Sequence, residues 1–124
     1  MFIHDKLSGF IFYAKSNDQK KDLSYYESRI DPNDGPLMSY SVFVVQYAKH
    51  LNVEKVTELL SKCYEPDFRP PFGALSETPN SQNPYFVTGV GALLQIVLFG
   101  LSGLEITEDG IIQNPSVLPK GWKK

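Results

Sequence analysis

One carboxylate stands out in a polar loop. Glu77 lies within the stretch Leu75–Pro84, LSETPNSQNP, which follows a proline cluster and precedes a strongly apolar segment. A carboxylate held on a rigid loop can act as a general base when the proton that it accepts lies within hydrogen-bond reach. The same position also suits an ordinary solvated carboxylate. The residue type and its setting therefore leave both interpretations open.

Several polar side chains near Glu77 have the chemistry to bind a sugar, because amide and phenol groups can donate hydrogen bonds to hydroxyl oxygens. Asparagine and its polar neighbours are equally common in turns, where they bind their own backbone. Both roles stay open for each of them. The residues are Asn80, Gln82, Asn83 and Tyr85.

Other catalytic and metal-binding patterns are missing from the sequence. His4 and His50 have no partner at metal-ligand spacing, and the single cysteine, Cys63, excludes an internal disulfide and a cysteine-cluster metal site. There is no glycine-rich phosphate loop, nucleophile elbow or zinc-binding helix motif. We therefore expect no metal and no cofactor. Cys63 lies at helical spacing from Val56 and Leu59, which predicts a buried structural thiol.

Three helices are expected to position the polar loop. The segment Phe86–Leu101 is apolar nearly all round, which predicts burial on every side. Leu37–Leu51 is apolar around most of its circumference, which predicts burial on both sides. Between them, Val53–Cys63 has one apolar stripe and one charged face, and Asn52 is a suitable N-cap. The order buried, surface, buried fits one outer helix between two inner helices of an α/α toroid.

The remaining segments are shorter. Asp22–Ser28 predicts a short helix preceded by a polar turn at Ser16–Lys21, and Asp31–Pro36 predicts a loop. Leu104–Gln113 reads as two short strands around a Glu-Asp-Gly turn. Met1–Lys15 fits neither the helical nor the strand period.

Composition limits the classes of partner. The chain has 124 residues, enough for about one domain, with 42% hydrophobic and 21% charged residues. The net charge of −2 provides no basic field, so we expect no nucleic acid partner. The apolar segment Phe86–Leu101 is shorter than the roughly 20 residues that span a bilayer, so we expect no membrane association. Met1–Phe10 lacks the pattern of a signal peptide, and the sequence assigns no compartment.

The run from Gly35 to Pro115 is similar to the end of the catalytic domain of family-65 glycoside hydrolases. The specific parts are GPLMSYS, PFGALSET and NPYFVTGVGALLQIVLFGLSGLEIT. The resemblance extends from about Lys21 to Lys124. It is closest to the hydrolase branch, which includes kojibiose hydrolase and glucosyl-galactosyl-hydroxylysine glucosidase.

This resemblance implies a mainly α fold, a partial (α/α)6 toroid made of the last helices of the barrel. Residues 1–103 would form this barrel fragment, and residues 104–124 a short β-hairpin and tail leading toward a C-terminal β-region. It also implies hydrolysis of an α-glucoside with inversion at the anomeric carbon. Glu77 would be the general base. The saccharide would contact the loop and the start of the next helix through Asn80, Gln82, Asn83, Tyr85 and Thr88.

Two features favour the hydrolases over the phosphorylases of the family. The phosphorylases bind phosphate where the base stands, through hydroxyl-rich and histidine-bearing segments. This chain keeps Ser39 and Ser41 but has no histidine near Thr88, and it has Glu77. The general acid of the family lies upstream of the segment represented here. We therefore expect a C-terminal fragment of an inverting α-glucosidase that is inactive alone.

A different class of function is also consistent with the sequence. Two strongly apolar helices in a short chain can form a non-catalytic module that binds another chain or a second copy of itself. A module that binds a saccharide without hydrolysing it lies between the two hypotheses.

Overall fold

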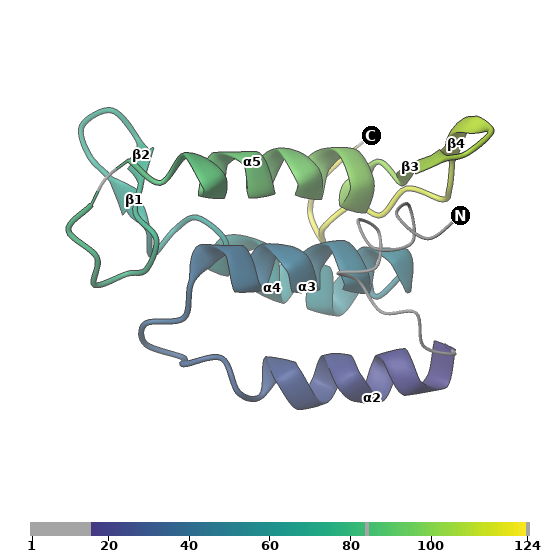
Figure 1. Cartoon of the computed structure of the whole chain (residues 1–124), viewed down its shortest axis with the longest axis horizontal. Coiled ribbons are helices and arrows are strands. Elements are labelled where there is room, and N and C mark those ends of the chain that lie inside the picture. The colour runs from purple at the N-terminus through teal and green to yellow at the C-terminus, as the bar shows by residue number, and fades with distance from the viewer. Residues whose placement is uncertain (1–15, 84, 124) are drawn as a thin grey trace.

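The computed structural model describes residues 16–83 and 85–123. In these ranges the chain is mainly helical, with two small antiparallel sheets. Figure 1 shows three layers of helices, with α3 and α4 in the middle layer. The layers consist of α2 (Ser16–Glu27), then α3 (Leu37–Lys49) with α4 (Val53–Lys62), then α5 (Val87–Gln95), which continues into the π-helix η1 (Ile96–Leu101).

The two sheets lie at opposite ends of α5 (Figure 1). One is the hairpin of β1 (Phe68–Arg69) and β2 (Ala74–Leu75). The other joins β3 (Leu104–Thr107) to β4 (Gly110–Gln113). The second hairpin confirms the predicted strands around the Glu-Asp-Gly turn, whereas the first was not predicted because its strands have only two residues each.

Helix α3 is the centre of the molecule, because it packs against α2, α4, α5 and η1. Val44, Val45 and Ala48 of α3 are buried in the main core. Glu27 connects α2 to α3 and α4. Its carboxylate accepts a hydrogen bond of 2.5 Å from the hydroxyl of Tyr47 and forms a salt bridge of 2.6 Å with Lys55. The other members of the core include Leu23, Val56, Leu59, Cys63, Ile96, Leu101 and Val117.

The structure confirms most of the predicted helices. Asn52 caps α4 as expected, since its side-chain oxygen accepts the backbone N–H of Lys55 at 3.1 Å. Cys63 is fully buried and its thiol donates to the carbonyl of Leu59, which confirms the structural thiol. The expected turn at Ser16–Lys21 was wrong, because these residues form the first half of α2. The segment Met1–Lys15 lies outside the described residues.

The prediction that Phe86–Leu101 is buried all round was also wrong for this chain. One side of α5 and η1 packs on α3, where Gly89, Ala92, Ile96 and Gly100 are buried. The opposite side is exposed. A Cβ at Gly89 would lie 2.7 Å from the side chain of Phe86 and 3.2 Å from that of Leu37, so the small residue permits this close contact. A Cβ at Gly100 would make only ordinary contacts with α3, and Gly91 has open space around it, so close packing explains Gly89 alone.

Candidate functional site

The candidate base Glu77 lies on the loop that connects β2 to α5. Its backbone carbonyl accepts the N–H of Leu37 at 3.0 Å, the first residue of α3. The N-cap residue of α3, Pro36, provides no side-chain hydrogen bond, so Glu77 satisfies an N–H that the helix leaves free. The side chain of Glu77 is exposed and makes no hydrogen bond or ion pair with any described residue. Its backbone is thus fixed while its carboxylate faces solvent.

Arg69 binds the loop that carries Glu77 through its guanidinium group. One guanidinium nitrogen, Nη2, donates to the carbonyl of Pro79 at 2.5 Å and contacts those of Thr78 and Ser81 at 3.4 and 3.5 Å. The other, Nη1, donates to the carbonyl of Pro66 at 2.9 Å. A planar guanidinium with five N–H groups suits such a cluster of carbonyls. Arg69 therefore connects the start of the β1–β2 hairpin to the loop that carries Glu77.

Ser76, the residue before Glu77, is held by the backbone of Asp67. The N–H of Ser76 donates to the Asp67 carbonyl at 2.9 Å, and its hydroxyl lies 3.2 Å from the same oxygen and 2.8 Å from the carbonyl of Thr78. On the far side of the loop, Asp34 accepts the N–H of Asn80 at 3.0 Å. Hydrogen bonds from Thr78 and Asn80 lower the pKa of the Asp34 carboxyl. The loop is therefore anchored on both sides of Glu77.

Asp67 has an unusual environment. Its side chain is 1% exposed, and within the described ranges neither carboxylate oxygen has a hydrogen-bond partner. Burial raises the pKa of Asp67 to about 6; the Arg69 guanidinium opposes this rise and the charge of Asp34 adds to it. Burial disfavours a charged carboxylate, which explains the direction. Sequence reasoning did not select Asp67 or Arg69 for the site, because neither belongs to a local motif and their surroundings depend on the pairing of β1 with β2.

The predicted saccharide-binding residues follow one another along the same exposed stretch. Asn80, Gln82, Asn83 and Thr88 are exposed, and Tyr85 is 80% exposed. Asn83 also serves the loop itself, since its side-chain oxygen accepts the N–H of Tyr85 at 3.3 Å. Their role toward a sugar stays a prediction.

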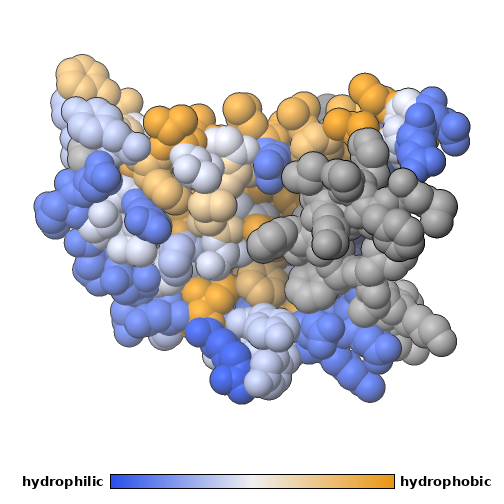
Figure 2. Space-filling model, in the orientation of Figure 1, coloured by the Kyte–Doolittle hydropathy of each residue, from blue (hydrophilic) through white to orange (hydrophobic). Residues whose placement is uncertain are grey.

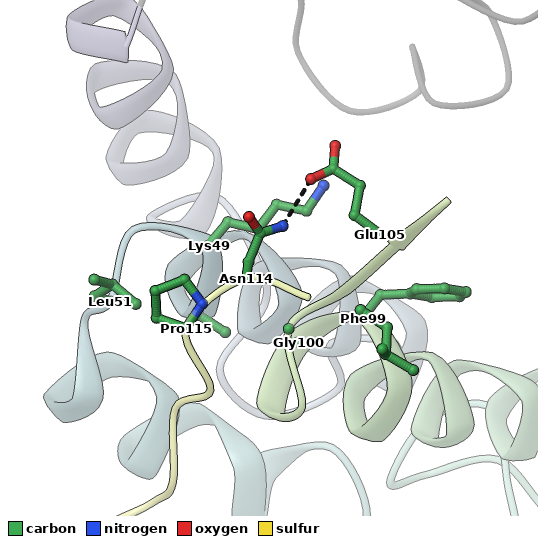
Figure 3. A pocket seen from close by; sticks show the side chains of 10 residues that line it. Lys49, Leu51, Phe99, Gly100, Glu105, Asn114 and Pro115 are labelled. Carbon is green, nitrogen blue, oxygen red and sulfur yellow. Dashed lines mark hydrogen bonds between the residues drawn. The ribbon is translucent and has the colours of Figure 1, made fainter. Parts of the chain in front are cut away.

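A hollow lies at the other end of α5, away from Glu77. It has a volume of about 260 Å³ and is lined by residues from the end of α3, η1, β3 and the segment after β4. Figure 3 shows Glu105 and Asn114 at this hollow, where the Asn114 amide donates to the Glu105 carboxylate at 2.8 Å. None of the predicted site residues lines it. Among the described residues, no group of histidine, cysteine and acidic side chains is placed to hold a metal ion.

Curated proteins resemble most of this chain. Over 105 residues it is 46% identical to a kojibiose hydrolase of Mucilaginibacter mallensis, a match covering 84% of this chain and 15% of that protein. Over 106 residues it is 40% identical to a kojibiose hydrolase of Flavobacterium johnsoniae, covering 85% of this chain and 16% of the relative. A protein-glucosylgalactosylhydroxylysine glucosidase of Dictyostelium discoideum is 34% identical over 117 residues, which are 93% of this chain and 16% of that protein.

This chain is a relative of glycoside hydrolases. The names of its relatives and the extent of the matches support that relationship, although no protein-family model matches the chain. The chain spans only 15–16% of the length of these relatives. The glycoside hydrolase relationship therefore applies to a segment of the relatives, not to their full length.

Proposed function

We propose that this chain is part of an inverting α-glucosidase of the family-65 type and that Glu77 is its general base. The observation that carries the proposal is the exposed Glu77 carboxylate on a loop whose backbone is fixed by Arg69, Ser76 and the start of α3. A base must keep its carboxylate free for water while its position is held. The kojibiose hydrolase relatives support the substrate class.

In this proposal α3 and α5 are inner helices, and α4 is an outer helix, of a partial (α/α)6 toroid. The amphipathic character of α4, with charged residues on its exposed face, supports this arrangement. The saccharide would lie over the loop and the start of α5, where Asn80, Gln82, Asn83, Tyr85 and Thr88 are exposed. An α-glucoside such as kojibiose is the substrate class that we propose.

Inversion needs a second carboxyl group, which protonates the leaving oxygen from a position roughly 6.5–9.5 Å from the base. We place this acid outside the present sequence and expect the chain alone to release no glucose. Water activation without protonation of the leaving group would leave the glycosidic bond intact. Release of glucose from kojibiose by the pure chain, lost on Glu77→Gln, would contradict this part of the proposal.

The test of the base is a chimera. The matched segment of the Mucilaginibacter kojibiose hydrolase is replaced by the corresponding segment of this chain, and glucose release from kojibiose is followed. Glu77→Gln should lower kcat by about 10²–10⁴-fold and leave KM nearly unchanged, because the base contacts the attacking water while other groups hold the sugar. Glu65→Gln is the matched control, since Glu65 is also an exposed carboxylate near this loop.

Two results would refute the proposal. One is a chimera in which Glu77→Gln and Glu65→Gln have the same turnover as the parent chimera. The other is a product that appears first as the α-anomer of glucose in proton NMR, since inversion of an α-glucoside releases the β-anomer.

A saccharide-binding module without catalysis is the second candidate, and the exposed polar stretch from Asn80 to Thr88 favours it. Titration of the isolated chain with glucose and kojibiose, monitored by amide chemical shifts, separates the two. Saturable shifts confined to this stretch, with a chimera that never hydrolyses kojibiose, would favour the binding module. A protein–protein interaction module is the third candidate function, and the exposed apolar residues of α5 favour it.

A further inference from the structure

The exposed side of α5 and η1 is largely apolar, although the polar residues Thr88 and Gln95 are also exposed on this helix. We define the apolar ridge as Val87, Val90, Leu94, Val97 and Leu98, whose side chains are between 45% and 77% exposed. They recur every three or four residues and so lie on one side of the helix. Figure 2 shows hydrophobic residues along the upper edge of the molecule, where Figure 1 places α5. Nothing within the described residues covers this ridge.

The ridge carries no charge. Between Val87 and Leu101 the sequence has no acidic or basic residue, and there is no lysine or arginine from Pro70 to Pro119. Helices that lie on anionic membranes place lysine and arginine on their polar face, which this segment cannot do. None of the described helices is long and apolar enough to cross a bilayer. An uncharged stripe of valine and leucine matches the apolar face of another protein element.

The size of the relatives indicates what that element is. The match to the kojibiose hydrolases covers most of this chain but only 15–16% of theirs, so the same segment in them belongs to a chain about six times as long. Helix α5 has the composition of a helix covered on two sides, and α3 covers only one. The uncovered side is where the larger part of such a hydrolase would pack.

We propose that the apolar ridge docks an apolar helical face of the larger part of a glycoside hydrolase chain, the part that the relatives carry outside the matched segment. This inference rests on the proposed function, and it names the partner of the same site. Val87 begins the ridge two residues after Tyr85, at the end of α5 that meets the Glu77 loop. A polypeptide seated on the ridge would therefore lie next to the end of the loop that carries Glu77.

The experiment is complementation. This chain, tagged, is co-expressed with the Mucilaginibacter kojibiose hydrolase from which the matched segment has been deleted. Co-purification and sedimentation report the complex, and glucose release from kojibiose reports activity. We expect a one-to-one complex and a higher soluble yield of the truncated hydrolase. Val90→Glu with Leu94→Glu should weaken the complex at least tenfold, because a buried unpaired carboxylate is costly.

Controls separate docking from folding. Both ridge residues are exposed in this chain, so the double variant should keep the circular dichroism and melting temperature of the parent. Tyr26→Glu is the matched control, because Tyr26 is an apolar residue on α2 with 52% exposure, outside the ridge. It should bind like the parent. Leu94→Ala with Val97→Ala gives a milder pair that removes apolar contacts without adding charge, and it should weaken binding in the same direction.

The outcomes distinguish this inference from the proposed base. A complex that is lost in the ridge variants but never hydrolyses kojibiose supports docking and counts against the proposed function. A complex that Glu77→Gln leaves intact while abolishing hydrolysis supports both. Absence of any complex or gain in soluble yield with the parent chain overturns the docking inference. So does a dimer of this chain alone that dissociates in the ridge variants while the truncated hydrolase stays unbound, since the occupant would then be a second copy.

Discussion

Replacing Asp67 by asparagine should change how the stability of this chain depends on pH. In the folded state the carboxyl has a pKa of about 6, raised by burial from an ordinary value of 3.8. Between these two values the folded protein binds more protons than the unfolded chain, so the free energy of unfolding falls as pH rises from about 4 to 6. Deprotonated Asp67 at neutral pH is a buried charge without a hydrogen-bond partner among the described residues.

The magnitude follows from the shift. About two pK units at about 1.4 kcal/mol each correspond to a loss on the order of 3 kcal/mol between pH 4 and pH 7. Asparagine has a similar shape and does not titrate. The free energy of unfolding of Asp67→Asn minus that of the parent should therefore rise between pH 4 and pH 7, by up to about 3 kcal/mol. Because the other carboxylates titrate in both proteins, their contributions cancel in the difference.

The assay is urea unfolding followed by circular dichroism at 222 nm, at half-unit steps from pH 2 to 8. Asp34→Asn is the control with the opposite sign. Hydrogen bonds from Thr78 and Asn80 lower the pKa of Asp34, so its contribution is present above the unfolded pKa and is lost as pH falls. A stability difference between Asp67→Asn and the parent that stays constant across the pH range would refute the reasoning about Asp67.

Two further predictions concern the elements that hold the site. Arg69→Gln should loosen the loop that carries Glu77, because it removes the guanidinium donors to the carbonyls of Pro79 and Pro66. Hydrogen exchange should then be faster at the amides of Asn80 and Ser81 than in the parent. Unchanged exchange at these amides would show that the loop keeps its conformation without Arg69. Asn52→Ala should destabilise the chain by about 1 kcal/mol, because it leaves the N–H of Lys55 without its cap, while Asn52→Asp restores an acceptor and most of the stability in the same urea titration.

Local chemistry explains where the sequence predicted the structure well. Asn52 at the start of α4 and the Glu-Asp-Gly turn between β3 and β4 depend on neighbouring residues, which the sequence displays directly. The turn expected at Ser16–Lys21 failed for a different reason. Leu23 is buried in the main core and Glu27 binds Tyr47 and Lys55, so tertiary contacts stabilise the half of α2 that the sequence predicted. The helix extends from there back over Ser16–Lys21, whose sequence has no apolar pattern of its own.

The candidate site also combines residues that the sequence indicates locally with residues that only the tertiary structure brings to it. The sequence by itself selected Glu77 on a polar loop and the exposed residues around it, because loop residues and their chemistry can be read locally. Only the tertiary structure revealed Arg69 under the loop and the buried Asp67, since both depend on a hairpin that pairs Phe68 with Leu75. The apolar pattern of Phe86–Leu101 predicted burial on every side, whereas in the folded chain one side packs on α3 and the other is exposed. The folded chain decided which side α3 covers, because packing direction depends on contacts between residues far apart in the sequence.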